Sequence, residues 1–187
     1  VLPLNRKVVL AVGTKFKQKG FDLLVQAFSK ISKNHLDWDL VIIGIDPMID
    51  KKNNINESIQ YLAENLNVSD RVYLPGQVGN IEDWYNRADL FILSSRYEGF
   101  PNVLLEAMAC GCPSIAFDCN TGPREIIDNG INGLLIPNND IEKLKNKMHE
   151  LMLDKVLRKK ISLEAVKIKE KFSDNSITID WLNVLQK

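Results

Sequence analysis

Residues 89–118 read DLFILSSRYEGFPNVLLEAMACGCPSIAFD, and this stretch decides the fold. The apolar run at its start predicts a buried strand, and residues 96–101 predict the loop that leaves it. From Asn102 onward the pattern indicates a helix, which can end where Gly111 caps it. A second apolar run, at 112–118, predicts the next strand. A strand, a helix and a strand in this order form one unit of a parallel sheet.

The same alternation continues along most of the chain. The segments predicted as strands are KVVLAVG (7–13), WDLVIIG (38–44), RVYLPG (71–76), DLFILSS (89–95), CPSIAFD (112–118) and GLLIP (133–137). Runs this apolar indicate strands buried on both faces. We therefore predict an α/β fold with a doubly wound, Rossmann-like parallel sheet, followed by a helical tail from Asp140 onward. The helix after the second strand is expected over 55–67, starting near Ile55 or Asn56.

Composition is typical of a globular protein of one domain. The chain has 187 residues, of which 45% are hydrophobic and 26% charged, and its formal net charge at pH 7 is zero. A zero net charge gives no reason to expect nucleic acid or anionic lipid as a partner. The lysine-rich stretch 142–171 contains interleaved acidic residues. We interpret it as a solvated helix face in preference to a membrane-binding helix.

The cysteines and histidines point to no metal site or catalytic pair. Cys110, Cys112 and Cys119 lack C-x-x-C spacing, which argues against a zinc site and a disulfide framework. We interpret them as small packing residues in a reducing compartment. His35 and His149 lie far apart in sequence in polar helical surroundings. We expect both at the surface, without a catalytic role.

The loop after the first strand, GTKFKQKG (13–20), is the usual phosphate site of this fold class. It lacks the G-x-G-x-x-G and G-K-[ST] spacings, so neither a dinucleotide site nor a P-loop is supported. It offers instead Lys15, Lys17 and Lys19, and lysine side chains suit a diphosphate. Three solvated loop lysines explain the segment equally well.

Glu98 and Glu106 are placed by the fold prediction at the carboxyl edge of the sheet. Helix amino termini bind anions at this edge, so two carboxylates there indicate a ligand with hydroxyl groups beside phosphate, such as a nucleotide sugar. Gly99 allows a close backbone approach, Pro101 fixes a dihedral angle, and Asn102 can cap the helix. A capped helix with two exposed glutamates explains the same residues without a ligand.

The segment EGFPNVLLEAMACGCPSIAFD resembles the signature of the large retaining glycosyltransferase family four, whose members have the two-domain GT-B fold. Other segments agree in order, namely GTKFKQKGFDLL, RVYLPGQV, ADLFILSSRYEG, TGPREII and NGINGLLIP. The resemblance implies that the chain is the carboxyl-terminal, nucleotide-sugar-binding half of such an enzyme. It implies a Rossmann-like donor domain over 1–172 and, over 173–187, a helix that packs toward an amino-terminal acceptor domain. The start VLPLNRK would fit a domain cut from a longer protein.

The resemblance also implies roles for single residues. The first glutamate of the pair contacts the transferred sugar in the family, which implies Glu98 as the catalytic residue. The second holds the ribose hydroxyls, which implies Glu106, and a lysine before the loop glycine pairs with the diphosphate, which implies Lys19. Backbone groups that receive the sugar and the diphosphate are implied at Gly99, Phe100, Pro101, Asn102 and Val103. The segment LPGQV implies Val78 as a backbone contact of the base.

One position departs from the family pattern. The family usually carries an arginine directly after the first-strand glycine, and this chain has Thr14 there. A fork-shaped donor to the diphosphate is lost, and lysine does not reproduce its geometry. Lys15 or Lys17 are the residues that would supply the charge.

The activity implied is that of a hexosyltransferase. The full-length enzyme would transfer a hexose or N-acetylhexosamine from a nucleotide diphosphate sugar, with uridine diphosphate (UDP) as our expectation, to an acceptor hydroxyl with retention. The product would belong to polysaccharide or glycoconjugate synthesis, and no cofactor or metal is expected. The partners implied are the nucleotide sugar and, through the missing amino-terminal domain, an acceptor glycan or lipid-linked glycan, with no nucleic acid. The expected location is cytoplasmic, and peripheral association with the inner face of the cell membrane stays open.

Two other classes also stay open from the sequence. A non-catalytic nucleotide-binding module of flavodoxin-like topology would share the strand order, but it would not need both glutamates. Half of a GT-B-like epimerase or phosphorylase is the other alternative. The epimerase would need acidic groups from an amino-terminal partner, and the phosphorylase a lysine placed for pyridoxal phosphate. The motif set favours the transferase, and we expect the 187 residues alone to bind the donor weakly without turnover.

Overall fold

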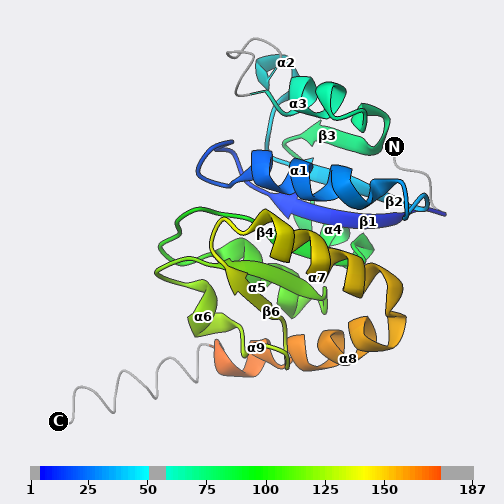
Figure 1. Cartoon of the computed structure of the whole chain (residues 1–187). Coiled ribbons are helices and arrows are strands. Elements are labelled where there is room, and N and C mark those ends of the chain that lie inside the picture. The colour runs from blue at the N-terminus through cyan, green and yellow to red at the C-terminus, as the bar shows by residue number, and fades with distance from the viewer. Residues whose placement is uncertain (1–4, 51–57, 174–187) are drawn as a thin grey trace.

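The computed structural model describes residues 5–50 and 58–173, and these form a parallel sheet covered by helices (Figure 1). The strand order is β3-β2-β1-β4-β5-β6, with every neighbouring pair parallel. The strands are β1 (Lys7–Val12), β2 (Trp38–Ile43), β3 (Val72–Gly76), β4 (Leu90–Leu93), β5 (Ser114–Asp118) and β6 (Leu134–Pro137). Each lies within a run that the sequence predicts as a strand. The prediction of a doubly wound, Rossmann-like α/β fold is therefore confirmed.

Helices cover both faces of the sheet. They are α1 (Phe21–Ser32), α2 (Pro47–Asp50), α3 (Ile59–Asn65), α4 (Ile81–Arg87), α5 (Asn102–Ala109), α6 (Pro123–Ile126), α7 (Ile141–Leu153), α8 (Lys155–Ala165) and α9 (Ile168–Lys171), with a short 3-10 helix at Ser69–Arg71. Figure 1 shows α1 and α7 in front of the sheet and α4 and α5 behind it. Helices α8 and α9 pack beside α5 and end the described chain.

Successive side chains of each strand point to opposite faces of the sheet, and this explains why the hydrophobic core has two layers. In β1, Val9 and Ala11 pack with α1 and α7 on one face, whereas Val8 and Leu10 pack with α4 and α5 on the other. All four are fully buried. Successive side chains of a strand point to opposite faces, so a continuous apolar run fills both layers. Each large aliphatic side chain buried in this way contributes about 1.5–3 kcal/mol to stability.

The order in which strands are added to the sheet changes at β1: β2 and β3 lie on one side of it, and β4, β5 and β6 lie on the other. Strand β1 pairs with β2 along its whole length, from Lys7↔Trp38 to Val12↔Ile43, and with β4 at Val9↔Leu90. The connections from β1 and from β4 therefore leave toward opposite sides of the sheet. A crevice opens between such loops outside the carboxyl ends of the strands, and ligands bind there in open α/β sheets.

The expected start of α3 and the expected capping role of Asn102 are wrong, whereas the expected start of α5 at Asn102 is confirmed. Helix α3 begins at Ile59, and its N-cap is Ser58, whose hydroxyl accepts a hydrogen bond from the amide of Tyr61 at 3.2 Å. Helix α5 begins at Asn102 itself, so the side chain of Asn102 caps nothing and the N-cap is Pro101. Proline fixes the backbone angle that starts a helix, which leaves the asparagine one position too late to cap.

The predicted end of α5 is confirmed. Gly111 has a φ of +76°, in the left-handed region that favours glycine. Its amide donates to the carbonyl of Met108 at 2.9 Å, and the amide of Cys112 donates to Ala107 at 3.0 Å. These two bonds are the Schellman arrangement, which satisfies the last carbonyls of the helix.

The interpretation of the cysteines as packing residues agrees with the structure, but the surface position expected for His35 is wrong. Cys112 and Cys119 are buried packing residues and Cys110 is partly buried. His35 is also buried, in the connection between α1 and β2, and its Nε2 lies 2.7 Å from Nδ1 of His149 on α7. Helices α1 and α7 pack side by side, so residues distant in sequence come into contact.

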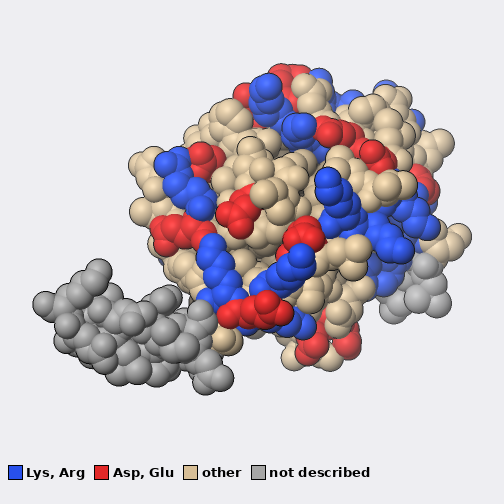
Figure 2. All heavy atoms as spheres, turned by 90° about the horizontal axis from the view of Figure 1, so that it is seen from below, with Lys and Arg blue, Asp and Glu red and all other residues tan. Residues whose placement is uncertain are grey.

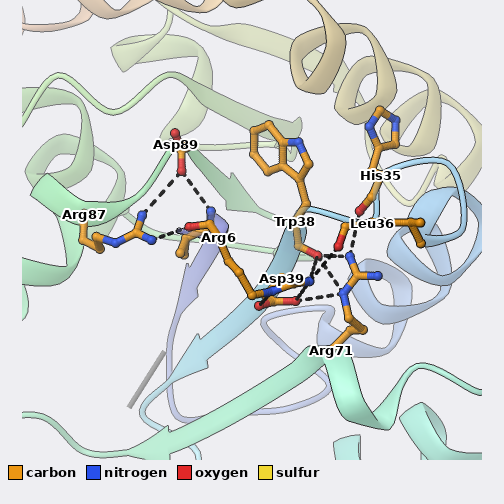
Figure 3. Close-up of polar contacts among 9 residues, drawn as sticks. Arg6, His35, Leu36, Trp38, Asp39, Arg71, Arg87 and Asp89 are labelled. Carbon is orange, nitrogen blue, oxygen red and sulfur yellow. Dashed lines mark hydrogen bonds and ion pairs between the residues drawn. The ribbon is translucent and has the colours of Figure 1, made fainter. Parts of the chain in front are cut away.

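A cluster of charged residues lies at the edge of the sheet where the strands begin, opposite the carboxyl ends of the strands (Figure 3). The carboxylate of Asp39 is fully buried and accepts hydrogen bonds from Arg6 at 2.5 Å and Arg71 at 2.8 Å. Arg71 also donates to the carbonyls of His35 and Trp38. Asp39 belongs to the D-x-D triplet 37–39, a pattern that binds metals elsewhere. Its arginine partners neutralise the buried charge, which accounts for this aspartate structurally.

Positive and negative side chains are interspersed over the lower face of the molecule (Figure 2). In the lysine-rich segment, Lys147 pairs with Glu150 at 2.6 Å and Lys167 with Glu164 at 2.7 Å. This pairing supports the interpretation of a solvated helix face. Within the described ranges, none of the helices combines the length and apolar character needed to cross a bilayer. The helix expected over 173–187 lies, beyond Ser173, outside the described residues.

Candidate functional site

The loop between β1 and α1 is held close to the end of β4 by Gly20. This residue is the N-cap of α1 and has a φ of +61°. A Cβ atom added to it would lie 2.0 Å from the carbonyl oxygen of Ser94. The hydroxyl of Ser94 in turn donates to the carbonyl of Lys19 at 2.8 Å. A residue with any side chain would push the two loops apart at this point.

Arg96 joins the same two loops with its backbone and its side chain. Its amide donates to the carbonyl of Gln18 at 2.8 Å, and its guanidinium forms two hydrogen bonds of 2.8 Å with the carboxylate of Asp22 on α1. A paired contact of this kind fixes orientation as well as distance. The carbonyl of Arg96 also accepts from Asn138, which ties in the loop after β6. Sequence reasoning missed Arg96, because its partners lie far away in the chain.

These contacts bring Lys19 and Glu98 together. The Nζ of Lys19 lies 2.7 Å from the Oε1 of Glu98, and both side chains are largely buried, with 17% and 6% of their surface exposed. The hydroxyl of Ser95 donates to the same Oε1 at 2.5 Å. The stem of Lys19 lies against Gly13, where an added Cβ would be 2.7 Å from its Cγ. The ammonium group can bind a phosphate, and the carboxylate can accept hydrogen bonds from sugar hydroxyls.

The segment from Glu98 to Pro101 leads into the amino terminus of α5. The hydroxyl of Thr121 donates to the carbonyl of Glu98, and Gly122, with a φ of +92°, lies so close that an added Cβ would be 2.5 Å from Cδ of Pro101. The loop after β5 therefore packs against the segment from Glu98 to Pro101 and restricts its position. The amide of Val103 lies in the first turn of α5, where the helix provides no acceptor for it. An anion placed at this end of the helix would be favoured by such amides.

Glu106 lies one turn into α5, and its side chain is exposed. Its Oε2 accepts a hydrogen bond of 2.8 Å from the hydroxyl of Tyr85 on α4. Tyr85 is almost fully buried, and its ring packs edge-on against Phe91 of β4. Burial and the neighbouring Glu106 carboxylate raise the pKa of Tyr85, so its phenol remains a hydrogen-bond donor. Sequence reasoning also missed Tyr85.

A cavity of about 930 Å³ opens over the carboxyl ends of β1, β2 and β3. Its lining includes Thr14 and Lys15 from the first loop, Gly44, Gln77 and Tyr97. The cavity has the size of a small-molecule site and shares the loop 13–20 with the Lys19–Glu98 pair. Lys19, Glu98 and Glu106 are not among its lining residues.

The predicted site residues lie in several places, and Pro101 is buried at the start of α5. Lys19 and Glu98 are in direct contact, and Thr14 and Lys15 are exposed at the cavity. Val78 is partly buried in the apolar cluster between the sheet, α4 and α5, together with Val103 and Tyr85. The exposed residues of the loop between β4 and α5 and of α5 itself are Gly99, Phe100, Asn102 and Glu106. In the part of the chain described, no three His, Cys, Asp or Glu side chains gather closely enough to hold a metal ion.

A six-stranded parallel sheet with helices on both faces matches the fold of the carboxyl-terminal domains of GT-B glycosyltransferases. Residues 1–167 match the family described as Glycosyl transferases group 1, so the chain belongs to this family. This membership confirms the resemblance to a GT-B glycosyltransferase found in the sequence.

Two of the similar curated proteins are named as glycosyltransferases. A poly(glycerol-phosphate) alpha-glucosyltransferase of Bacillus subtilis is 31% identical over 186 residues, covering 100% of this chain and 27% of that protein. An uncharacterized glycosyltransferase of Haemophilus influenzae is 29% identical, covering 97% of this chain and 50% of that protein. The chain thus spans at most about half the length of these curated relatives.

Solved structures support the same fold. A variant of TarM from S. aureus, crystallised with Fondaparinux, alpha-GlcNAc-glycerol and UDP, superposes with a TM-score of 0.85 at 28% identity, covering 98% of this chain and 36% of that one. The carboxyl-terminal domain of the group 1 glycosyl transferase LpcC from Francisella tularensis superposes with a TM-score of 0.77 at 25% identity, covering 89% and 86% of the two chains. The second match is to a structure of a carboxyl-terminal domain alone.

Proposed function

We propose that this chain is the donor-binding part of a hexosyltransferase that uses a UDP-sugar. The observation that carries the proposal is the contact of Lys19 with Glu98 at the switch point of the sheet, 2.7 Å between Nζ and Oε1. A cation for the diphosphate and an acceptor for the sugar hydroxyls meet where this fold binds its ligands. The TarM structure holds UDP, which supports uridine as the base. The family match favours a transferase over a non-catalytic module, an epimerase or a phosphorylase.

In this proposal each end of the donor has its own contacts. Lys19 and the backbone groups from Gly99 to Val103, before and at the start of α5, bind the diphosphate and the sugar, with Glu98 positioning the sugar. Glu106 accepts hydrogen bonds from the ribose, and the backbone at Val78 contacts the base. Thr14 replaces an arginine, so Lys15 at the neighbouring cavity supplies the further positive charge.

The reaction proposed is glycosyl transfer with retention. The acceptor oxygen forms a bond to the anomeric carbon on the face that the diphosphate leaves, and the bond from that carbon to the diphosphate oxygen breaks. The acceptor proton passes to the departing diphosphate. Lys19 and the amino terminus of α5 stabilise the charge that develops on this leaving group. No step in this scheme assigns a role to a metal ion.

The curated relatives are longer than this chain, and this difference is the basis for proposing a further domain that binds the acceptor. We propose residues 1–172 as the donor domain and 173–187 as a segment that packs toward an acceptor-binding domain elsewhere in the full-length protein. That domain would bind a glycan or lipid-linked glycan during polysaccharide or glycoconjugate synthesis, as the name of the Bacillus relative indicates for a related polymer. A cytoplasmic location, with or without peripheral attachment to the inner membrane face, is part of the same proposal.

Isothermal titration calorimetry tests the donor assignment. UDP, guanosine diphosphate and adenosine diphosphate are titrated into the chain, with uridine as a control that lacks the diphosphate. We expect UDP to bind most tightly and uridine to bind at least about tenfold more weakly, because it forms no charge-assisted hydrogen bonds with Lys19. Equal affinities for UDP and uridine, or binding of none of these compounds, would contradict the proposal.

A further inference from the structure

The hydroxyl of Tyr85 occupies one oxygen of the Glu106 carboxylate. The donor–acceptor distance of 2.8 Å is that of a good charge-assisted hydrogen bond. The phenol donates to Oε2, and Oε1 can accept hydrogen bonds from other donors. Glu106 is exposed, whereas Tyr85 is only 2% exposed. An exposed glutamate side chain would otherwise sample many rotamers, so the contact restricts a mobile acceptor.

The donor in this contact is fixed by its own packing. The ring of Tyr85 lies 6.0 Å from that of Phe91, centroid to centroid, in an edge-on arrangement. Its apolar cluster also includes Val78 and Val103, the residues next to which the base and the diphosphate are proposed to bind. Tyr85, on α4, is therefore packed in the same apolar cluster as these two residues, and its hydroxyl position is set by the core.

We propose that Tyr85 is a positioning residue that holds Glu106 in the orientation needed to accept hydrogen bonds from the two ribose hydroxyls of the nucleotide. The proposal rests on the proposed function, because it assumes a ribonucleotide donor. A carboxylate oxygen has two lone-pair sites, so the Glu106 carboxylate retains acceptor capacity for both hydroxyls after binding the phenol. A fixed acceptor loses less conformational freedom when the ligand binds.

A purely structural role would give Tyr85 the same contact. A buried phenol needs a hydrogen-bond partner whatever the ligand, and Glu106 supplies one. The two roles differ in what happens to ribose recognition when the hydroxyl is removed. Tyr85→Phe keeps the ring in the core and deletes the donor together with its need for a partner, so the change suits this comparison.

The test compares UDP with 2′,3′-dideoxyuridine diphosphate by calorimetry. The readout is the dissociation constant of the dideoxy compound divided by that of UDP. This ratio isolates the contribution of the ribose hydroxyls from those of the base and the diphosphate. For the unaltered chain we expect UDP to bind at least about tenfold tighter. In Tyr85→Phe the ratio should fall toward that of Glu106→Gln. In the double variant it should fall no further than in Glu106→Gln alone, because the phenol acts through the carboxylate.

Tyr61→Phe is the matched control, since Tyr61 is an exposed tyrosine on α3. The ratio of dissociation constants for Tyr61→Phe should equal that of the unaltered chain. If Tyr85→Phe does not fold, Glu106→Asp serves instead. The shorter carboxylate of this exposed residue cannot keep the 2.8 Å contact without moving, and the ratio should again fall.

The outcomes separate the two proposals. A Tyr85→Phe chain with a lower melting temperature but an unchanged ratio would show a structural role only and overturn this inference, leaving the proposed function intact. An unchanged ratio in Glu106→Asp would overturn this inference together with the ribose contact proposed for Glu106, while UDP binding would still support a nucleotide donor. Absence of nucleotide binding by the unaltered chain would overturn the proposed function and this inference with it.

Discussion

The ammonium group of Lys19 and the carboxylate of Glu98 are partners across the switch point of the sheet, 2.7 Å apart and mostly shielded from water. One comes from the loop after β1 and the other from the loop after β4. Before a ligand binds, each group thus neutralises the other. A diphosphate would share the lysine, and a sugar would take up the acceptor capacity of the glutamate. The pair therefore links the two halves of the proposed donor.

Replacing Lys19 by methionine should weaken UDP binding while leaving uridine binding unchanged. The variant keeps an aliphatic stem against Gly13 but loses the charge, so the diphosphate loses a charge-assisted hydrogen bond. We expect a fall in affinity of about 10- to 100-fold by calorimetry. Lys33→Met is the control, because Lys33 is exposed at the far end of α1. An unaltered UDP affinity in the Lys19 variant would remove Lys19 from the site.

Replacing Glu98 by glutamine should have opposite effects on UDP and on UDP-sugars. Loss of the carboxylate releases Lys19 and removes a negative charge near the diphosphate, so UDP should bind as tightly as before or more tightly. The sugar loses its charged acceptor, so the affinity of UDP-glucose or UDP-N-acetylglucosamine relative to UDP should fall by about tenfold. Glu64→Gln, at an exposed position on α3, is the control. Parallel losses for all three ligands would contradict a sugar contact.

The sequence predicted those features of the fold and site that depend on local pattern. The strand positions followed from apolar runs, and the loops that carry Lys19 and Glu98 followed from the strand order. The contacts of Arg96 with Asp22 and of Tyr85 with Glu106 were not predictable in this way, because each joins segments 74 or 21 residues apart.

The errors have a similar physical origin. Asn102 has the chemistry of a helix cap, but the backbone of Pro101 already occupies that position. His35 lies in a polar stretch, which indicates exposure, yet α7 folds over it and brings His149 into contact. A residue's neighbours in the sequence do not report what a distant helix covers.

The stability of the chain should fall as the pH is lowered from about 6.5 toward 5. Burial, and then the positive charge that His149 can carry, lower the pKa of His35 in the folded protein, with Lys7 and Arg71 acting in the same direction and Asp37 opposing them. The unfolded chain therefore binds more protons at His35 over this range, and protonation favours unfolding. The contribution of His35 to the free energy of unfolding is fully present above the pKa of His35 in the unfolded chain, and it declines as the pH falls below that value. Urea denaturation at a series of pH values measures the effect.

The slope attributable to one histidine cannot exceed about 1.4 kcal/mol per pH unit. His35→Gln should flatten the dependence between pH 5 and 6.5, whatever its absolute stability. Carboxylates with lowered pKa values, such as Glu142 with a pKa of about 2, lose their contribution only at lower pH and do not interfere. An equal slope in the variant would assign the dependence to other groups.

Replacing Gly20 by alanine should destabilise the fold and separate the two loops of the site. Alanine at a φ of +61° costs about 1–2 kcal/mol, and its Cβ would overlap the carbonyl oxygen of Ser94 at 2.0 Å, which forces a backbone shift. We expect a total loss of at least about 2 kcal/mol in the free energy of unfolding, together with weaker UDP binding, because Lys19 moves away from Glu98. Gly79→Ala is the matched control. Gly79 is exposed and an added Cβ would meet nothing within 4 Å, so its stability should change by less than about 0.5 kcal/mol. Equal stabilities for the two variants would show that the close approach of Gly20 to Ser94 does not hold the loops together.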